Sequence, residues 1–221
     1  MKTVSIFALP IEGALQFPSY PIAPSRLLEC NRMLRPEARA RSLAAELLLC
    51  WAVRHMRPAH VPSPPLRSYL PQGKPYFREN PDFAFSLSHA EEWAVLAVSD
   101  VPLGIDLEKT GKGGAPVVAR FFHEQEKKFF DTLPESQQED AFCKLWVLKE
   151  SVVKALGTGM HFPFSRFAVS LTPTPSVCGL ETSAQLFLHP FSEEYRLGGC
   201  VLTDEAVSPS LQILSLDEVL K

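Results

Sequence analysis

The stretch LWVLKESVVKALGTG, from Leu145 to Gly159, decides how the rest of the chain is interpreted. Glu150 and Lys154 are four residues apart within it, so in a helix they lie one turn above the other on one face. Its apolar residues recur at helical spacing, and glycines end it: Leu148, Val152, Ala155 and Leu156, then Gly157 and Gly159. The stretch therefore predicts an amphipathic helix that carries an acid–base pair.

The face with Glu150 and Lys154 is too apolar for an ordinary solvated surface, because Trp146 and Val153 border it. A helical salt bridge is the usual explanation for a glutamate and a lysine at this spacing. A pair that is partly desolvated is also a candidate for a functional site. A second acidic motif decides between the two interpretations.

That second motif is LGIDLE, from Leu103 to Glu108, which predicts a strand with Asp106 and Glu108 pointing to the same side. Strands disfavour acidic residues, and the two carboxylates repel each other. A surface edge strand can tolerate them, but a cation between them turns repulsion into affinity. Such oxygen ligands suit Mg²⁺, so we favour a divalent metal site. Gly104 would let a ligand or another chain segment approach closely.

Two weaker signals precede this motif. Gly73–Pro75 (GKP) predicts a tight turn with a lysine at its tip, a common surface feature. Phe83–Ser88 predicts a strand with one aromatic face, and the short HAEE connection to Trp93–Val98 predicts a hairpin. Ser88 and His89 are then expected at the turn.

Elsewhere before residue 102 we expect a strand at Val4–Leu9, a short helix capped by Ser25 and a long helix from Pro36 to about Met56. Arginines crowd the start of the long helix, where positive charge opposes the helix dipole: Arg35, Arg39 and Arg41. A solvated basic face and an anion held near the helix are both open explanations.

After residue 108 we expect a flexible loop at Lys109–Pro116 and a short helix at Arg120–Phe130 (RFFHEQEKKFF), which either packs in the core or offers an aromatic patch to a partner. The helix of the opening stretch is expected to begin at Glu139. Strands are expected at Arg166–Leu171, Ala184–Leu188, Tyr195–Leu202 and, as a candidate, Gln212–Leu214, before a short polar end.

Composition excludes several function classes. The chain has 221 residues, of which 46% are hydrophobic and 21% are charged, as in a soluble globular protein. Its net charge of −3 gives no field for nucleic acid or anionic membranes, and no segment approaches the ~20 apolar residues of a membrane span. The N-terminus is a poor signal peptide. Five scattered cysteines without a CxxC motif indicate free thiols, and we expect a cytoplasmic protein.

The predicted elements run strand, helices, hairpin and then strand, helices, hairpin again. The break falls near Val101 and Pro102, although no residue-level repeat is visible. We therefore expect an α+β protein of two similar halves, residues 1–102 and 103–221. Each would pack a small antiparallel sheet with helices, and the active site would lie in the cleft between them.

Taken together, four motifs resemble those of a known family. GIDLE (Gly104–Glu108), followed about forty positions later by Trp146–Gly159, resembles the paired signature of the 4′-phosphopantetheinyl transferases. GKP and SLSHA (Ser86–Ala90) resemble the longer, surfactin-synthetase-activating (Sfp) type. The match runs from about Ser42 to Leu171. Each motif is modest alone, and the four in this order are specific.

The resemblance implies transfer of the phosphopantetheine arm of coenzyme A to a serine of an apo acyl or peptidyl carrier protein, with release of adenosine 3′,5′-bisphosphate. Such carriers serve fatty acid, polyketide or nonribosomal peptide biosynthesis. It also implies Mg²⁺ dependence and a pseudo-twofold pair of α+β halves with coenzyme A between them. A monomer is expected, because both halves lie in one chain.

The resemblance also implies roles for single residues. Asp106, Glu108 and Glu150 would ligate Mg²⁺, Glu150 would also take the serine proton, and Lys154 would pair with the pyrophosphate. Those expected at the nucleotide end are Arg41, Lys74, Ser88 and His89, with His89 on the 3′-phosphate. Members often have two basic residues before the first long helix. Arg26 matches one and Glu29 falls near the other, which is a departure. Arg120–Phe130 lies where the family tends to contact carriers.

Two alternatives stay open beside this interpretation. A Mg²⁺-dependent hydrolase of coenzyme A would use the same metal and lysine but would need no carrier. A non-catalytic coenzyme A-binding module is the other alternative. The intact set of Asp106, Glu108, Glu150 and Lys154 argues against it, because a pure binder has no use for a base beside the metal.

Overall fold

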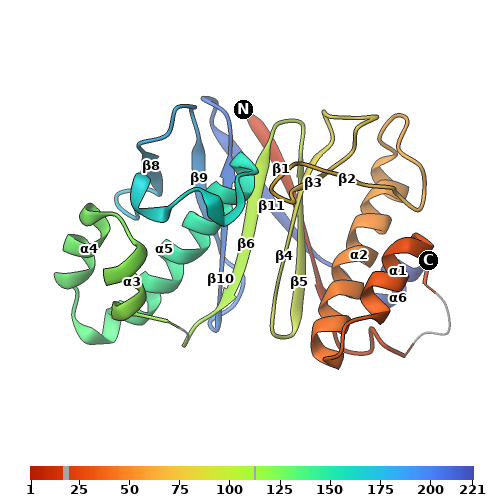
Figure 1. The fold of residues 1–221 in the computed structure, drawn as a ribbon, viewed down its shortest axis with the longest axis horizontal. Coiled ribbons are helices and arrows are strands. Elements are labelled where there is room, and N and C mark those ends of the chain that lie inside the picture. Colours follow the sequence, from red (N-terminus) through yellow and green to blue (C-terminus); the bar gives the residue numbers. More distant parts are fainter. Residues whose placement is uncertain (17–19, 112) are drawn as a thin grey trace.

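The computed structural model describes residues 1–16, 20–111 and 113–221. Its strands lie between two groups of helices (Figure 1). The helices are α1 (Pro24–Asn31), α2 (Pro36–Met56), α3 (Ala115–Phe121), α4 (Glu124–Asp131), α5 (Glu135–Leu156) and α6 (Leu216–Leu220), with 3-10 turns at Gly159–His161 and Phe164–Arg166. The predicted α+β class is confirmed.

Two sheets form the centre of the molecule. The first has the order β11-β1-β5-β4, with β1 parallel to β11 and the other pairs antiparallel. The second is antiparallel, with the order β6-β10-β9. Their strands are β1 (Lys2–Pro10), β4 (Ala84–Ala90), β5 (Trp93–Ser99), β6 (Leu103–Lys109), β9 (Gln185–His189), β10 (Tyr195–Val201) and β11 (Val207–Ile213). Two short pairs complete the fold: β2 (Ser68–Tyr69) with β3 (Pro75–Tyr76), and β7 (Ala168–Ser170) with β8 (Ser176–Cys178).

Helix α2 covers the first sheet, and its predicted range is confirmed. Pro36 stands in its first turn, where the missing N–H costs no hydrogen bond. Its buried face includes Leu43 and Leu47, and Trp51 meets Phe7 edge to face at 4.9 Å. The short helix before it is also confirmed, but its cap is wrong. Ala23 rather than Ser25 is the N-cap residue, because Pro24 already occupies the first helical turn.

Helix α5 packs on the second sheet and ends as predicted, at a glycine in the left-handed conformation (Gly157, φ 71°). It begins at Glu135, one turn earlier than expected. Close contact with β6 explains Gly104, since a Cβ there would lie 2.0 Å from the Ser151 carbonyl oxygen. The close approach of another segment, one of the two expectations at this glycine, is therefore confirmed.

Four expectations on local structure are wrong. Strand β4 continues to Ala90, so Ser88 and His89 lie in the strand and the turn is Glu91 and Glu92 alone. Arg120–Phe130 forms the end of α3 and most of α4, divided at Phe122, rather than one helix. The polar end is helix α6, and β11 begins five residues before the expected strand. The loop expected at 109–116 includes position 112, which lies outside the described residues.

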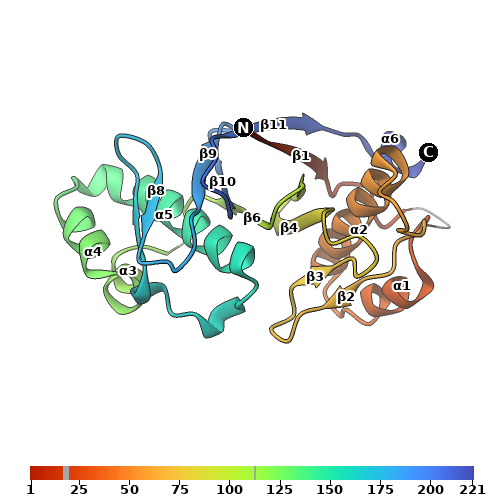
Figure 2. The same ribbon diagram turned by 90° about the horizontal axis from the view of Figure 1, so that it is seen from above.

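The two sheets meet at β4 and β6, which lie side by side (Figures 1 and 2). They are joined by side chains, because the Ile105 N–H donates to the Ser86 hydroxyl at 3.1 Å and the Leu107 N–H to the Ser88 hydroxyl at 3.4 Å. Apolar side chains of β1 and β6 share one core cluster, among them Ile6 and Ile105.

The division into residues 1–102 and 103–221 stays a prediction. The first helix group and sheet form one half around α2, and α5 with the second sheet forms the other. The last segment of the chain, however, packs on the first half. Strand β11 pairs with β1, and Val219 of α6 is buried in the core of the first half. Pseudo-twofold symmetry also stays a prediction. None of the described helices is long and apolar enough to cross a membrane.

Candidate active site

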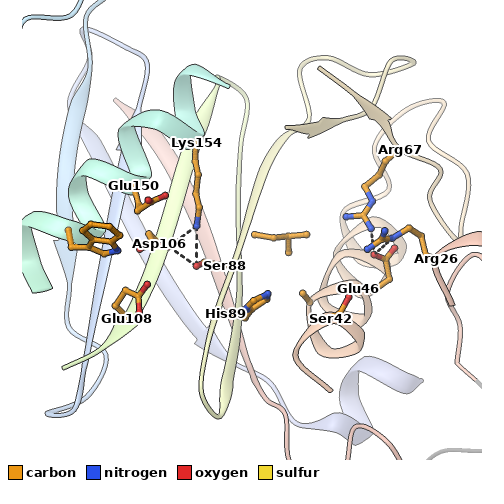
Figure 3. Close-up of a pocket in the computed structure, with 13 residues that line it drawn as sticks. Arg26, Ser42, Glu46, Arg67, Ser88, His89, Asp106, Glu108, Glu150 and Lys154 are labelled. Carbon is orange, nitrogen blue, oxygen red and sulfur yellow. Dashed lines mark hydrogen bonds and ion pairs between the residues drawn. The ribbon is translucent and has the colours of Figure 1, made fainter. Parts of the chain in front are cut away.

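A cavity of about 420 Å³ lies between the two halves (Figure 3). Figure 3 shows acidic residues and a lysine on one side, arginines on the other, and β4 between them. The cavity is lined by Arg26, Ser42, Ala45, Glu46, Arg67, Leu87, Ser88, His89, Asp106, Glu108, Trp146, Glu150 and Lys154. It therefore brings together six of the eight predicted site residues: Ser88, His89, Asp106, Glu108, Glu150 and Lys154.

Asp106 is the buried centre of the acidic side, at 4% exposure. Its Oδ1 accepts hydrogen bonds from Lys154 Nζ at 2.6 Å and from the Ser88 hydroxyl at 2.7 Å. Its Oδ2 is buried and has no hydrogen-bond partner. A buried carboxylate oxygen without a partner costs stability, so this position favours a further cation or donor.

Lys154 joins three elements at this point. Besides Asp106, its ammonium donates to the Ser88 hydroxyl and to the Ile105 carbonyl, each at 3.1 Å. All three N–H groups therefore have an acceptor, and the lysine connects α5 to both β4 and β6. The interpretation of Glu150 and Lys154 as a simple i,i+4 salt bridge is wrong, because the lysine pairs with Asp106 instead.

Glu150 stands one helical turn before Lys154 and faces the same cavity. Burial raises the pKa of its carboxyl above the usual value, and the negative charge of Asp106 raises it further, against the opposing effect of Lys154. Glu108 points to the same side of β6 as Asp106 (Figure 3). The acidic side therefore carries three carboxyl groups and one lysine.

The carboxyl groups of Asp106, Glu108 and Glu150 are the candidate ligands for a metal ion. Among the described residues, no group of three acidic, histidine or cysteine side chains is arranged to hold a metal ion alone. The unpartnered Asp106 Oδ2 and the raised pKa of Glu150 nevertheless fit a cation that takes few ligands from protein. Mg²⁺ binds in this way, with water and substrate phosphates as the other ligands.

The opposite side of the cavity is built on Glu46 of α2, a carboxylate at 1% exposure. Its Oε2 accepts from Arg26 Nε at 3.2 Å and from the Arg67 guanidinium. The Arg67 side chain is 5% exposed, and its Nε is buried without a partner. Because Glu29 also pairs with Arg26, the two arginines and two glutamates balance in charge. Arg67 Nε remains an unused donor that could bind an anion, although Glu46 Oε1 is also buried without a partner.

Arg67 and Glu46 were missed by the sequence analysis. Arg67 follows the proline-rich connection after α2, where nothing indicates which way a side chain points. Glu46 could have been found from the sequence, because an acidic residue on the apolar face of a helix indicates a buried charge that needs a partner. Glu29, the departure from the family pattern, is exposed and pairs with Arg26.

His89 lies between the two sides and opens to the cavity, so part of its ring is exposed. The surrounding protein still lowers its pKa by desolvation, and the charges of Arg41 and Lys154 lower it further. The lowered pKa favours the neutral imidazole, which can both donate and accept a hydrogen bond.

Arg41 and Lys74 do not line the cavity. An Arg41 N–H donates to the Glu91 carbonyl at 3.5 Å, beside the β4–β5 turn. The sequence predicted Lys74 at the tip of a surface turn, but its side chain is turned inward. Its ammonium donates to two main-chain carbonyls, those of Leu103 and Ala155.

Comparisons with known proteins agree on one family. Residues 102–201 match the model of the 4′-phosphopantetheinyl transferase superfamily. A 4′-phosphopantetheinyl transferase of Bacillus subtilis is 32% identical over 185 residues, which cover 78% of each chain. The 4′-phosphopantetheinyl transferase gsp of Aneurinibacillus migulanus is 30% identical over 150 residues, which cover 66% of this chain and 62% of that protein.

Among solved structures, a holo-(acyl-carrier-protein) synthase from Bacillus anthracis in complex with CoA (3′,5′-ADP) matches with a TM-score of 0.40 and 22% identity. The match covers 46% of this chain and 95% of the synthase. The identity to the Bacillus subtilis relative and the match to the family model show that the chain belongs to the 4′-phosphopantetheinyl transferase superfamily. The family predicted from the four motifs is confirmed, and with it the transferase class.

Proposed function

We propose that this protein transfers the 4′-phosphopantetheine arm of coenzyme A to a serine of an apo acyl or peptidyl carrier protein, with Mg²⁺, and releases adenosine 3′,5′-bisphosphate. One observation carries the proposal. A single cavity has three carboxyl groups and a lysine on one side, and on the other a histidine and two arginines with the carboxylate of Glu46 that they share. A pyrophosphate at the centre and a nucleotide phosphate at one end would complement these charges.

Asp106, Glu108 and Glu150 would hold the Mg²⁺. When bound, the metal supplies charge neutralisation at the pyrophosphate and orients its oxygens. The unpartnered Asp106 Oδ2 supports this assignment. Without a cation, three carboxyl groups would repel an anionic substrate, so metal dependence is part of the proposal.

Glu150 is the candidate base. It would accept the proton of the carrier serine, directly or through a water, as the serine oxygen attacks the phosphorus. In the metal-free protein, burial and the charge of Asp106 raise the pKa of Glu150.

Lys154 would stabilise the negative charge of the pyrophosphate. Its contacts with Asp106, Ser88 and the Ile105 carbonyl fix its position before any substrate is bound. A cation that needs little rearrangement is more effective in the transition state than a mobile one.

Arg26, Arg67 and His89 would hold the nucleotide end, with the 3′-phosphate between the arginines and the histidine. The unpartnered Arg67 Nε supports this role, because it can donate to a phosphate without giving up Glu46. Ser42 lines the same end and adds a hydroxyl. Arg41 would act at longer range, since it contacts the neighbouring turn.

The carrier and the state of the enzyme complete the proposal. We expect a monomer that acts in the cytoplasm and meets the carrier on the side of α3. There Phe121 is 47% exposed and stacks with the Arg120 guanidinium at 5.0 Å. A basic and aromatic surface of this kind suits an acidic, partly apolar helix.

An intact-mass assay tests the reaction. The protein is incubated with coenzyme A and several apo carrier proteins, with Mg²⁺ or with a chelator. Addition of one phosphopantetheine to the carrier only when Mg²⁺ is present is the expected result. Metal-dependent loss of coenzyme A without carrier modification would identify a hydrolase instead, and binding without consumption would identify a binding module.

A further inference from the structure

The segment between β2 and β3 belongs to the first half of the chain but contacts the second half. Its turn is closed by hydrogen bonds from the Leu70 N–H to the Lys74 carbonyl (2.9 Å) and from the Gly73 N–H to the Leu70 carbonyl (2.8 Å). Figure 2 shows this hairpin extending from the side of α1 and α2 toward the end of α5. It therefore crosses between the helix groups on one side of the sheets.

Lys74 makes the polar part of this contact. Its ammonium donates to the Ala155 carbonyl in the last turn of α5 at 2.8 Å, and to the Leu103 carbonyl at the start of β6 at 3.1 Å. The last carbonyls of a helix lack intrahelical partners, and a positive charge there is favoured by the helix dipole. One side chain thus satisfies acceptors on two elements of the other half.

Close packing supports the polar contact. A Cβ at Gly157 would lie 2.9 Å from Leu70 Cδ1 and 3.2 Å from Lys74 Cδ, and a Cβ at Gly159 would lie 3.4 Å from the Gln72 carbonyl oxygen. Both glycines also have positive φ. The GTG sequence after α5 therefore provides a helix stop and, at the same point, the space in which the hairpin docks.

The two elements that Lys74 joins carry the acidic side of the cavity. Ala155 directly follows Lys154, and Leu103 begins the strand that leads to Asp106. The same connection contains Arg67 immediately before β2, and the Arg67 side chain lies on the opposite side of the cavity. The hairpin thus links the arginine side to the helix with Glu150 and Lys154.

We propose that Lys74 is a positioning residue that clasps the β2–β3 hairpin to the end of α5 and the start of β6, and so sets Lys154 and Asp106 relative to the arginine side of the cavity. The proposal rests on the proposed function for its kinetic consequence. It differs from a nucleotide-binding role for Lys74, because Lys74 does not line the cavity and its ammonium is directed at main-chain carbonyls of α5 and β6. Burial also lowers the pKa of Lys74 to about 8, as expected for an ammonium enclosed by protein without a carboxylate partner.

The test compares Lys74→Met with Lys74→Arg, which keeps a positive donor, and with Lys144→Met, a partly exposed lysine on the same helix. For Lys74→Met we expect kcat to fall about 10- to 100-fold, since small displacements at a reacting centre have effects of this size. The Kd for coenzyme A should change less than about threefold. Lys74→Arg should recover much of kcat, and Lys144→Met should match the unmodified protein.

Hydrogen exchange gives a readout that does not depend on activity. In the substrate-free protein, Lys74→Met should speed backbone exchange at residues 151–157, and Lys144→Met should not. Leu70→Ala, which removes the apolar part of the clasp but keeps the lysine, should have a smaller effect in the same direction. This variant keeps the test decisive if Lys74→Met fails to fold.

Two results would overturn the proposal. A large loss of coenzyme A affinity with unchanged kcat and unchanged exchange would make Lys74 a nucleotide ligand. Unchanged kinetics and exchange would leave it without a role. Faster exchange in a protein whose unmodified form transfers nothing would instead support the clasp and reject the proposed function.

Discussion

Glu150 combines a catalytic position with an unfavourable environment. The pKa of its carboxyl is raised in the folded protein by burial and by the negative charge of Asp106. Between the unfolded pKa of about 4.5 and the raised folded pKa, the folded state binds more protons than the unfolded state. The stability contributed by this group is therefore present at low pH and lost as the pH rises through the folded pKa.

Glu150→Gln removes this penalty and the candidate base together. In buffer with a chelator, we expect a higher Tm than for the unmodified protein at pH 7.5, and a gain that shrinks as the pH falls toward 4.5. Transfer in Mg²⁺ should fall by about 10²- to 10⁴-fold, while coenzyme A still binds. Thermal melts at several pH values and the intact-mass assay measure both. Substantial residual transfer would remove Glu150 from the role of base.

The arginine side predicts discrimination between two forms of the substrate. Arg67→Met should weaken coenzyme A by about 10- to 100-fold, the effect of one charged hydrogen bond, and should weaken dephospho-coenzyme A much less. His89→Ala should show the same preference. Titration calorimetry with both ligands gives the ratio for each variant, so each variant is its own control.

Folding of the Arg67 variant needs a separate control, because Arg67→Met leaves Glu46 buried with one arginine. In the double variant Arg67→Met with Glu46→Met, stability should recover while the loss of coenzyme A affinity remains. Equal losses for the two ligands would place the 3′-phosphate away from these residues.

Site residues could be predicted where the local sequence alone sets their direction. Asp106 and Glu108 share one side of a strand, and Glu150 and Lys154 share one face of a helix, whatever the tertiary structure. Long side chains in turns and connections could not be placed in this way. Lys74 is directed by carbonyls more than 25 residues away in the sequence, and Arg67 by a buried glutamate on α2.

At the scale of elements, a buried ion pair joins α5 to α4. Lys149 is fully buried, and its ammonium donates to both oxygens of Glu126 (2.7 and 2.8 Å) and to the Phe167 carbonyl (2.9 Å). It also lies 4.1 Å from the centroid of the Phe167 ring. Glu126 in turn accepts from the Val169 and His123 N–H groups, so α5, α4 and β7 meet at one pair.

Loss of one partner of this pair should be costly. We expect Lys149→Met to lower the free energy of unfolding by about 3–5 kcal/mol, because it leaves a buried carboxylate unpaired. Lys149→Met with Glu126→Gln should recover part of this loss, and Lys144→Met should cost less than about 1 kcal/mol as an exposed pair. Urea denaturation measures all three. A cost below 1 kcal/mol for Lys149→Met would mean that the pair does not hold α5 in place.

The elements themselves followed from the sequence where a periodic pattern was long. The ranges of α2 and β6 and the end of α5 were predicted, because apolar spacing and glycine stops are local signals. The division between α3 and α4 was missed because His123 acts as an N-cap, with its side chain accepting from the Gln125 N–H. Strand β4 was expected to end too early, because its polar end residues face the cavity rather than a turn.

At the scale of the whole molecule, the two halves are joined by more than the cleft. Ser86 and Ser88 bridge the sheets through their hydroxyls, β1 and β6 share an apolar core, and the last segment of the chain returns to β1. This return was not predictable, because Pro209 argues against a strand at this position and β11 pairs with a strand about 200 positions away in sequence. Local patterns do not identify such partners.

This connection predicts one unfolding transition for the entire chain. Trp51 reports on the core of the first half and Trp146 on the second, and in a background with Trp93→Phe each can be left as the single tryptophan. Their fluorescence transitions in urea should coincide, because a shared core cannot unfold in one half without exposing apolar surface of the other. Ser86→Ala leaves the buried Ile105 N–H without its acceptor. It should lower the free energy of unfolding by about 1–3 kcal/mol and shift both urea midpoints down together. Separate midpoints for the two tryptophans would show instead that the halves are independent folding units. The cleft would then be an interface between two domains, free to change its width, rather than a fixed feature of one cooperative structure.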